Sequence, residues 1–94
     1  MQDVNHLALF PLGRIVITRG VHAAIEAEKV LDALLRHAQG DWGDVCDEAR
    51  HSNDEALARQ FRLFSVYGVS DKSKFWIITE ADRSYTTILL PEEY

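Results

Sequence analysis

Apolar and polar residues change their spacing along this chain, and the change predicts where helices give way to strands. In residues 21–38 the apolar positions recur every three or four residues on one stripe, which is typical of an amphipathic helix. From Phe61 onward apolar positions alternate with others, which is typical of strands that bury one face. The last part of the chain is therefore expected to form a sheet that the helical part covers.

Three strand segments follow one another in this last part. Residues 61–69 and residues 74–79 flank the turn at residues 70–73 and predict a hairpin. Residues 85–90 follow the charged turn at residues 80–84 and predict a third strand. Because both connections are short, we expect an antiparallel meander.

The earlier part of the chain adds a strand and a second helical stretch. Residues 14–18 are β-branched at three consecutive positions and predict a short buried strand. Residues 45–59 predict one interrupted helix or two short ones on the surface, with Asp44 as N-cap and capping-box spacing at residues 52–55. The fold class is therefore α+β, in the order β-α-α-β-β-β. Two helices pack on a three-stranded C-terminal antiparallel meander plus an N-terminal strand.

Length and composition indicate one domain, residues 1–94, with an N-terminal arm at residues 1–11. Apolar residues make up 47% of the chain, which is enough for a core, and no apolar run is long enough to span a bilayer. The first residues lack the basic region of a secretory signal. Because Cys46 is the sole cysteine, no internal disulfide is expected, and a reducing, cytoplasmic setting is predicted without membrane contact.

The formal net charge of −5 is unevenly distributed. Residues 21–60 hold nine acids against four cations, whereas the segments before and after them nearly balance. A field of this sign disfavours direct nucleic-acid binding and favours a protein partner with a basic surface.

Several segments together carry a family resemblance. They are LGRIV at residues 12–16, GDWGD at residues 40–44, WIITEADRS at residues 76–84 and ILLPEEY at residues 88–94. The chain resembles, over roughly residues 12–94, a family of small plasmid- and mobile-element-associated bacterial proteins, usually described as plasmid-related proteins. Residues 1–11 depart from that pattern. The resemblance implies a mobile-DNA setting and brings no catalytic residues with it.

The acidic loop and helix at residues 41–55 form the first candidate site. Six carboxylates there accompany one strong cation, Arg50, and such a run can imitate the phosphates of a nucleic acid and occupy a basic channel of a nuclease. A solvated surface helix explains the same charges. Trp42 either fills the core or anchors a contact. The predicted partner-binding residues are Asp41, Trp42, Asp44, Asp47, Glu48, Asp54 and Glu55.

The turn at residues 80–84 is expected to support that site. Asp82 can cap the turn through its own backbone, and Arg83 can pair with Glu80 or with a carboxylate such as Asp44. The alternative is that Glu80, Asp82 and Arg83 form a polar recognition patch.

Metal and cofactor sites are not predicted. His37, Cys46 and His51 are ligand types, but their separations do not form the close pairs that a zinc half-site needs. An RNA-cleaving toxin of a toxin–antitoxin pair is the enzymatic alternative, although its need for phosphate contacts conflicts with the negative charge. Its candidate residues would be Arg62, Tyr67, Lys72, Lys74, Arg83 and Tyr85.

These observations favour a non-enzymatic protein-binding module from a mobile genetic element. Its expected action is that of an acidic inhibitor of a host defence complex, of the anti-CRISPR or anti-restriction type. Two alternatives stay open: the RNA-cleaving toxin, and a dimeric structural module that pairs through an exposed sheet edge.

Overall fold

The structure of the protein, a computed structural model, describes residues 8–68 and 73–94. Within these residues the elements are β1 (Arg14–Ile17), α2 (Arg19–Ala24), α3 (Ala27–Ala38), α4 (Asp47–Arg59), β2 (Leu63–Tyr67), β3 (Phe75–Thr79), β4 (Tyr85–Leu89) and the short 3-10 helix η1 (Pro91–Glu93). The predicted α+β fold is confirmed. Most of the turn predicted at residues 70–73 lies outside the described residues.

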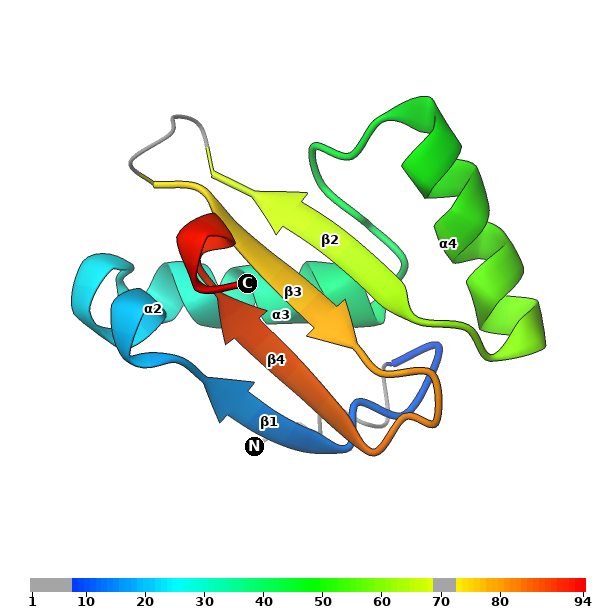
Figure 1. Cartoon of the computed structure of the whole chain (residues 1–94), viewed down its shortest axis with the longest axis horizontal. Helices are drawn as coiled ribbons and strands as arrows, with labels where there is room; N and C mark the ends of the chain where they lie inside the picture. The colour runs from blue at the N-terminus through cyan, green and yellow to red at the C-terminus, as the bar shows by residue number, and fades with distance from the viewer. Residues whose placement is uncertain (1–7, 69–72) are drawn as a thin grey trace.

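The strands form a four-stranded sheet in the order β1-β4-β3-β2 (Figure 1). Strands β2, β3 and β4 form the predicted antiparallel meander, and β1 pairs parallel to β4 at the opposite edge from β2. Figure 1 shows α3 behind the sheet, whereas α4 lies beside β2. The two long helices therefore occupy different places, one under a face and one along an edge.

Alternation along the strands gives the sheet two unlike faces. On the face toward α3, Leu63, Ile77 and Ile88 are fully buried in the main core. On the other face Trp76 is half-buried, and its ring meets those of Phe64 and Tyr94 edge-on at centroid distances of 4.9 and 5.7 Å. The α3 side of the sheet therefore holds most of the apolar core.

The N-terminal strand forms where it was predicted, but the prediction that it is buried is wrong. All of its residues are exposed, and Ile17 retains 48% of its surface. A β-branched run favours strand structure at an edge as much as at the centre of a sheet, and here the strand takes the edge. The residues before it are more buried than an arm would be, since Phe10 and Leu12 keep only 7% and 2% of their surface.

Both helical predictions need correction at their boundaries. The helix predicted over residues 21–38 is broken, because Ile25 and Glu26 take extended backbone conformations between α2 and α3. The break lets Ile25 enter the core while Thr18 caps α2 through the Val21 N–H. The second stretch is one continuous helix, α4, and its N-cap is Cys46 rather than Asp44.

A chain of buried polar side chains joins α3 to four segments far away in the sequence. His37 on α3 has no exposed surface, and its Nδ1 lies 2.6 Å from the Ser65 hydroxyl on β2 while its Nε2 lies 2.9 Å from the Thr79 hydroxyl on β3. The Thr79 and Thr86 hydroxyl oxygens are 2.7 Å apart, and the Thr86 hydroxyl donates to the Leu12 carbonyl at 2.6 Å. Every member is thereby paired.

With a neutral imidazole, the form that burial favours, one arrangement gives each of these contacts one proton. Because the Thr86 proton goes to the Leu12 carbonyl, the Thr79 hydroxyl must donate to the Thr86 oxygen. Thr79 must then accept from His37 Nε2–H, and His37 Nδ1 must accept from the Ser65 hydroxyl. The chain therefore places the proton of the neutral His37 on Nε2.

Burial opposes ionisation of this imidazole and, with the nearby charge of Arg83, lowers the pKa of His37 from 6.5 to about 3. In the unfolded chain the group takes up a proton below pH 6.5, whereas the folded protein does not until about pH 3. Neutral His37 therefore makes its full contribution to the free energy of unfolding above pH 6.5. This contribution is lost progressively as the pH falls from 6.5 to about 3.

We predict that the free energy of unfolding falls by about 2 kcal/mol between pH 7 and pH 5 because of His37. The variant His37→Gln should be less stable at pH 7 but should lack this part of the pH dependence. Urea denaturation of both proteins at the two pH values measures the difference, in which other titrating groups cancel. Equal pH dependence in the two proteins would contradict the assignment.

Candidate functional site

The loop before α4 places Trp42 inside the molecule. Trp42 retains 1% of its surface, stacks on Phe10 at a centroid distance of 6.2 Å and meets the His37 ring edge-on at 5.6 Å. Its indole N–H donates to the Asp54 carboxylate at 3.2 Å. The expectation that Trp42 anchors a partner is therefore corrected: it is a core residue that holds the loop to α4.

This loop also runs along the outer edge of β2. The Val66 N–H donates to the Trp42 carbonyl at 3.1 Å, and the Asp44 N–H donates to the Val66 carbonyl at 2.8 Å. Gly43 makes the approach possible, because its φ of 72° is a conformation that L side chains rarely adopt and a Cβ there would collide with the Val66 carbonyl. The loop thus serves as a further strand-like partner for β2.

Asn53 closes the next part of the same edge. Its side-chain amide donates to the Phe64 carbonyl at 2.7 Å and accepts from the Phe64 N–H at 3.1 Å. Asn53 retains only 3% of its surface, so this pair is shielded from water. Both outward-facing peptide groups of the central part of β2 are therefore satisfied, and α4 is fixed against the sheet.

Arg83 fastens the other end of α4. Its guanidinium donates to four backbone carbonyls, those of Ala56, Phe61, Glu80 and Ala81, at 2.9, 2.6, 3.1 and 3.4 Å. The predicted pairing with the Glu80 carboxylate or with Asp44 is wrong. Ala56 lies in the last turn of α4, where the negative end of the helix dipole attracts a cation.

The remaining charges of that turn have local roles. The Asp82 carboxylate accepts from the Ser84 N–H at 3.0 Å and from the Ser84 hydroxyl at 2.6 Å, which caps the turn as predicted and lowers the pKa of Asp82. The Glu80 carboxylate lies 3.3 Å from the Arg62 guanidinium, which also donates to the Tyr94 hydroxyl at 2.7 Å. The turn residues are thus engaged with the protein itself.

The predicted acidic residues divide into two groups. Asp41 forms a two-point contact with the Arg36 guanidinium at 2.8 and 3.3 Å, and this bonding lowers the pKa of Asp41. The other five carboxylates are exposed, and we call them the acidic surface: Asp44, Asp47, Glu48, Asp54 and Glu55. Within the described residues their sole ion pair joins Asp47 to Arg50 at 4.0 Å.

Helix geometry arranges the acidic surface in two rows. Asp47 and Asp54 are seven residues apart, as are Glu48 and Glu55, so each pair lies close to two turns apart, or about 10 Å along the axis of α4. Because α4 is held at Asn53 and at its C-terminal end, these rows keep a fixed position relative to the sheet. The structure thus presents a preorganised negative surface.

The residues of the toxin alternative are dispersed. Tyr67 is buried toward α3, where its hydroxyl donates to the Asp41 carbonyl at 2.6 Å and burial raises the pKa of Tyr67 to about 12. Tyr85 is 42% exposed. Arg62 and Arg83 make the internal contacts described above, and Lys72 lies outside the described residues.

In residues 8–68 and 73–94, no three His, Cys, Asp or Glu side chains are placed so that they could hold a metal ion. Both nitrogens of His37 are bonded to hydroxyl groups, whereas the Cys46 thiol is free and exposed. The described helices are each too short or too polar to cross a bilayer.

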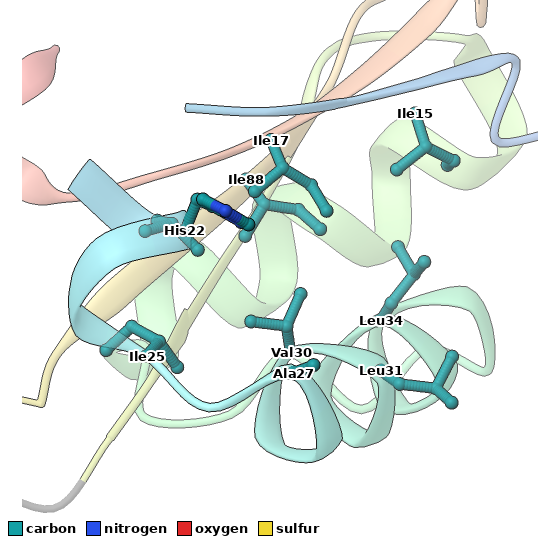
Figure 2. Close-up of a pocket in the computed structure, with 10 residues that line it drawn as sticks. Ile15, Ile17, His22, Ile25, Ala27, Val30, Leu31, Leu34 and Ile88 are labelled. Carbon is teal, nitrogen blue, oxygen red and sulfur yellow. The ribbon is translucent and has the colours of Figure 1, made fainter. Parts of the chain in front are cut away.

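An apolar groove between β1 and α3 was not predicted from the sequence. It has a volume of 260 Å³, and Figure 2 shows Ile15 and Ile17 on the strand side facing Val30 and Leu34 on the helix side. Leu31, at the rim, is 53% exposed. The signal in the sequence is the apolar run of β1 at an edge position, which could not be recognised before the strand order was known.

Comparison of the chain with protein-family models, with curated proteins and with solved structures found no match.

We predict that Asn53→Ala lowers the free energy of unfolding by about 2 kcal/mol, because it leaves the buried N–H and C=O of Phe64 without partners. Amide hydrogen exchange should accelerate in α4 and at Phe64. The neighbouring Ser52→Ala, at an exposed position of the same helix, serves as the control and should change stability by less than about 0.5 kcal/mol. Equal stability of the two variants would show that the amide pair does not hold α4.

Proposed function

We propose that the protein is a non-enzymatic binding module that captures a basic surface of a host protein through its acidic surface. One observation carries the proposal: five exposed carboxylates share a single weak ion pair, and four of them stand on a helix that is fastened to the sheet, while Asp44 lies in the loop before it. Fixed charges of one sign attract a complementary surface over a distance and orient it on contact.

The internal contacts of the neighbouring residues support this choice of surface. Asp41, Glu80 and Asp82 are occupied by hydrogen bonds or ion pairs within the protein. Trp42 and Arg83 hold the loop and the end of α4 in place. Their contribution to binding would be to fix the acidic surface, so that less conformational entropy is lost when a partner docks.

Inhibition of a host defence complex is the specific form that we propose for this activity. Two rows of carboxylates on a rigid helix would take the place of the phosphates that bind in a basic channel of a nuclease. The same charges repel nucleic acid itself, so the target would be the protein that binds it. The mobile-element setting of the proposal rests on the sequence resemblance alone.

We predict that Glu48→Lys with Glu55→Lys abolishes capture of bacterial host proteins, since the reversals place cations in the middle of the acidic surface. The matched control is Glu28→Lys with Glu92→Lys, which makes the same change in net charge at exposed positions outside that surface. Affinity capture from host lysate at low and high salt, read by mass spectrometry, compares the two. The proposal is supported if the wild type and the control capture the same proteins and the first variant does not. High salt should weaken this capture.

If both double variants capture an identical set of proteins, the proposed role of the acidic surface is contradicted. The narrower claim is tested by phage infection of cells that carry a CRISPR or restriction system. Expression of the wild-type protein should restore plaques, and expression of the Glu48/Glu55 variant should not. If capture depends on the acidic surface but infection is unchanged across such systems, binding stands and defence inhibition is wrong.

A further inference from the structure

The outward N–H and C=O groups of the two edge strands, β2 and β1, differ in their hydrogen bonding. At the β2 edge, Asn53 and the loop at residues 42–44 pair with the outward peptide groups. At the β1 edge, the Arg14 N–H donates to the Ser84 carbonyl and the Thr18 N–H to the Ile88 carbonyl, so the even-numbered residues of β1 face β4. The N–H and C=O groups of Ile15 and Ile17 therefore point away from the sheet.

No hydrogen bond within the described part of the chain reaches these outward groups of Ile15 and Ile17. The side chains around them are also unusually apolar for an edge. The exposed large apolar residues gathered at β1 and its immediate neighbours are Ile15 at 39%, Val16 at 38%, Ile17 at 48%, Leu31 at 53% and Tyr85 at 42%. Natural edge strands normally carry charges, prolines or bulges that discourage pairing, and the interior of β1 carries none of these.

We infer that β1 pairs antiparallel with β1 of a second copy of this chain, about a twofold axis at Val16, to form one continuous sheet. The outward N–H and C=O groups of Ile15 and Ile17 determine the register of this pairing. With Val16 opposite Val16, Ile15 of each copy forms a hydrogen-bonded pair with Ile17 of the other, and every outward group of both residues finds a partner. A shift in either direction would bring in Gly13, which has a φ of 66°, or Arg19, which belongs to α2.

The side chains match in this register on both faces of the sheet. Ile15 of one copy lies beside Ile17 of the other on the α3 side, which joins the two apolar grooves, and the Val16 side chains meet on the opposite face. Arg14 falls opposite Thr18, so no like charges oppose one another along the seam. The acidic surface lies beyond β2, so the negative charges of the two copies remain at the two ends of the joined sheet (Figure 1).

The size of the patch indicates a weak interaction. The exposed apolar surface around β1 amounts to a few hundred Å² per copy, whereas a stable dimer buries about 800 Å² per partner. Pairing is therefore weaker than in a stable dimer and reversible, so the dimer forms only at high protein concentration. A dimer of this form would present its acidic surfaces in opposite directions, a consequence that rests on the proposed function although the pairing itself does not.

Sedimentation velocity between about 1 and 500 μM, a range that extends into the weak-binding regime, tests the inference on the full chain. The wild-type protein should shift from monomer to dimer across the range. Val16→Lys alone and Val16→Glu alone should each stay monomeric, because the twofold axis places two like charges together. An equimolar mixture of the two variants should dimerise again, because the pair at the axis then becomes Lys opposite Glu.

Phe61→Lys is the control, since Phe61 is 54% exposed and precedes β2 at the other edge. It should dimerise as the wild type does. Circular dichroism should show that both Val16 variants remain folded, which their exposed position allows. A wild-type protein that stays monomeric throughout, a Val16→Lys protein that still dimerises, or a mixture that stays monomeric would overturn the inference. A monomer whose edge takes up an extended peptide from another protein belongs to the first of these outcomes.

Discussion

The requirement that every buried polar group find a partner shapes this protein more than any single apolar contact. The chain from Ser65 through His37, Thr79 and Thr86 to the Leu12 carbonyl is fully buried in its side chains, and it spans α3, three strands and the segment before β1. A fully satisfied network of this kind selects one arrangement of its elements, because any shift leaves a buried group unpaired. Trp42 and Phe10 pack around the His37 ring, so the loop before α4 depends on the same centre.

The same requirement explains the difference between the sheet edges. The loop at residues 42–44 reaches β2 because Trp42 is anchored beside His37, and Asn53 then meets the adjacent peptide group from α4. Closure of this edge holds α4 in place and thereby sets the position of the acidic surface. The β1 edge has no comparable cover among the described residues and exposes its isoleucines instead. The β2 edge is thus covered by other parts of the described chain, whereas the β1 edge, on the opposite side of the sheet, is accessible for contacts from outside.

Local patterns in the sequence predicted the elements well and their environment poorly. Period-two alternation and short turns located the meander, and Asp82 was recognised as a turn cap from its residue type alone. The break at Ile25 was missed because Ile25 fits the apolar stripe of a continuous helix. Asn53 was placed in a capping box, although its position on the stripe with Ala49 and Ala56 could have marked it as a buried polar residue.

Long-range contacts decided the rest. The burial of Trp42 depends on its contacts with Phe10 and His37, and two of the carbonyls that Arg83 binds belong to α4 and the segment after it. Neither outcome follows from the adjacent residues in the sequence alone. The most direct test of the central role of His37 is the ¹⁵N NMR spectrum of its imidazole ring between pH 7 and pH 5. We expect a proton on Nε2, none on Nδ1, and resonances that do not move over this range. A titration with a midpoint near pH 6.5, or a proton on Nδ1, would contradict the account.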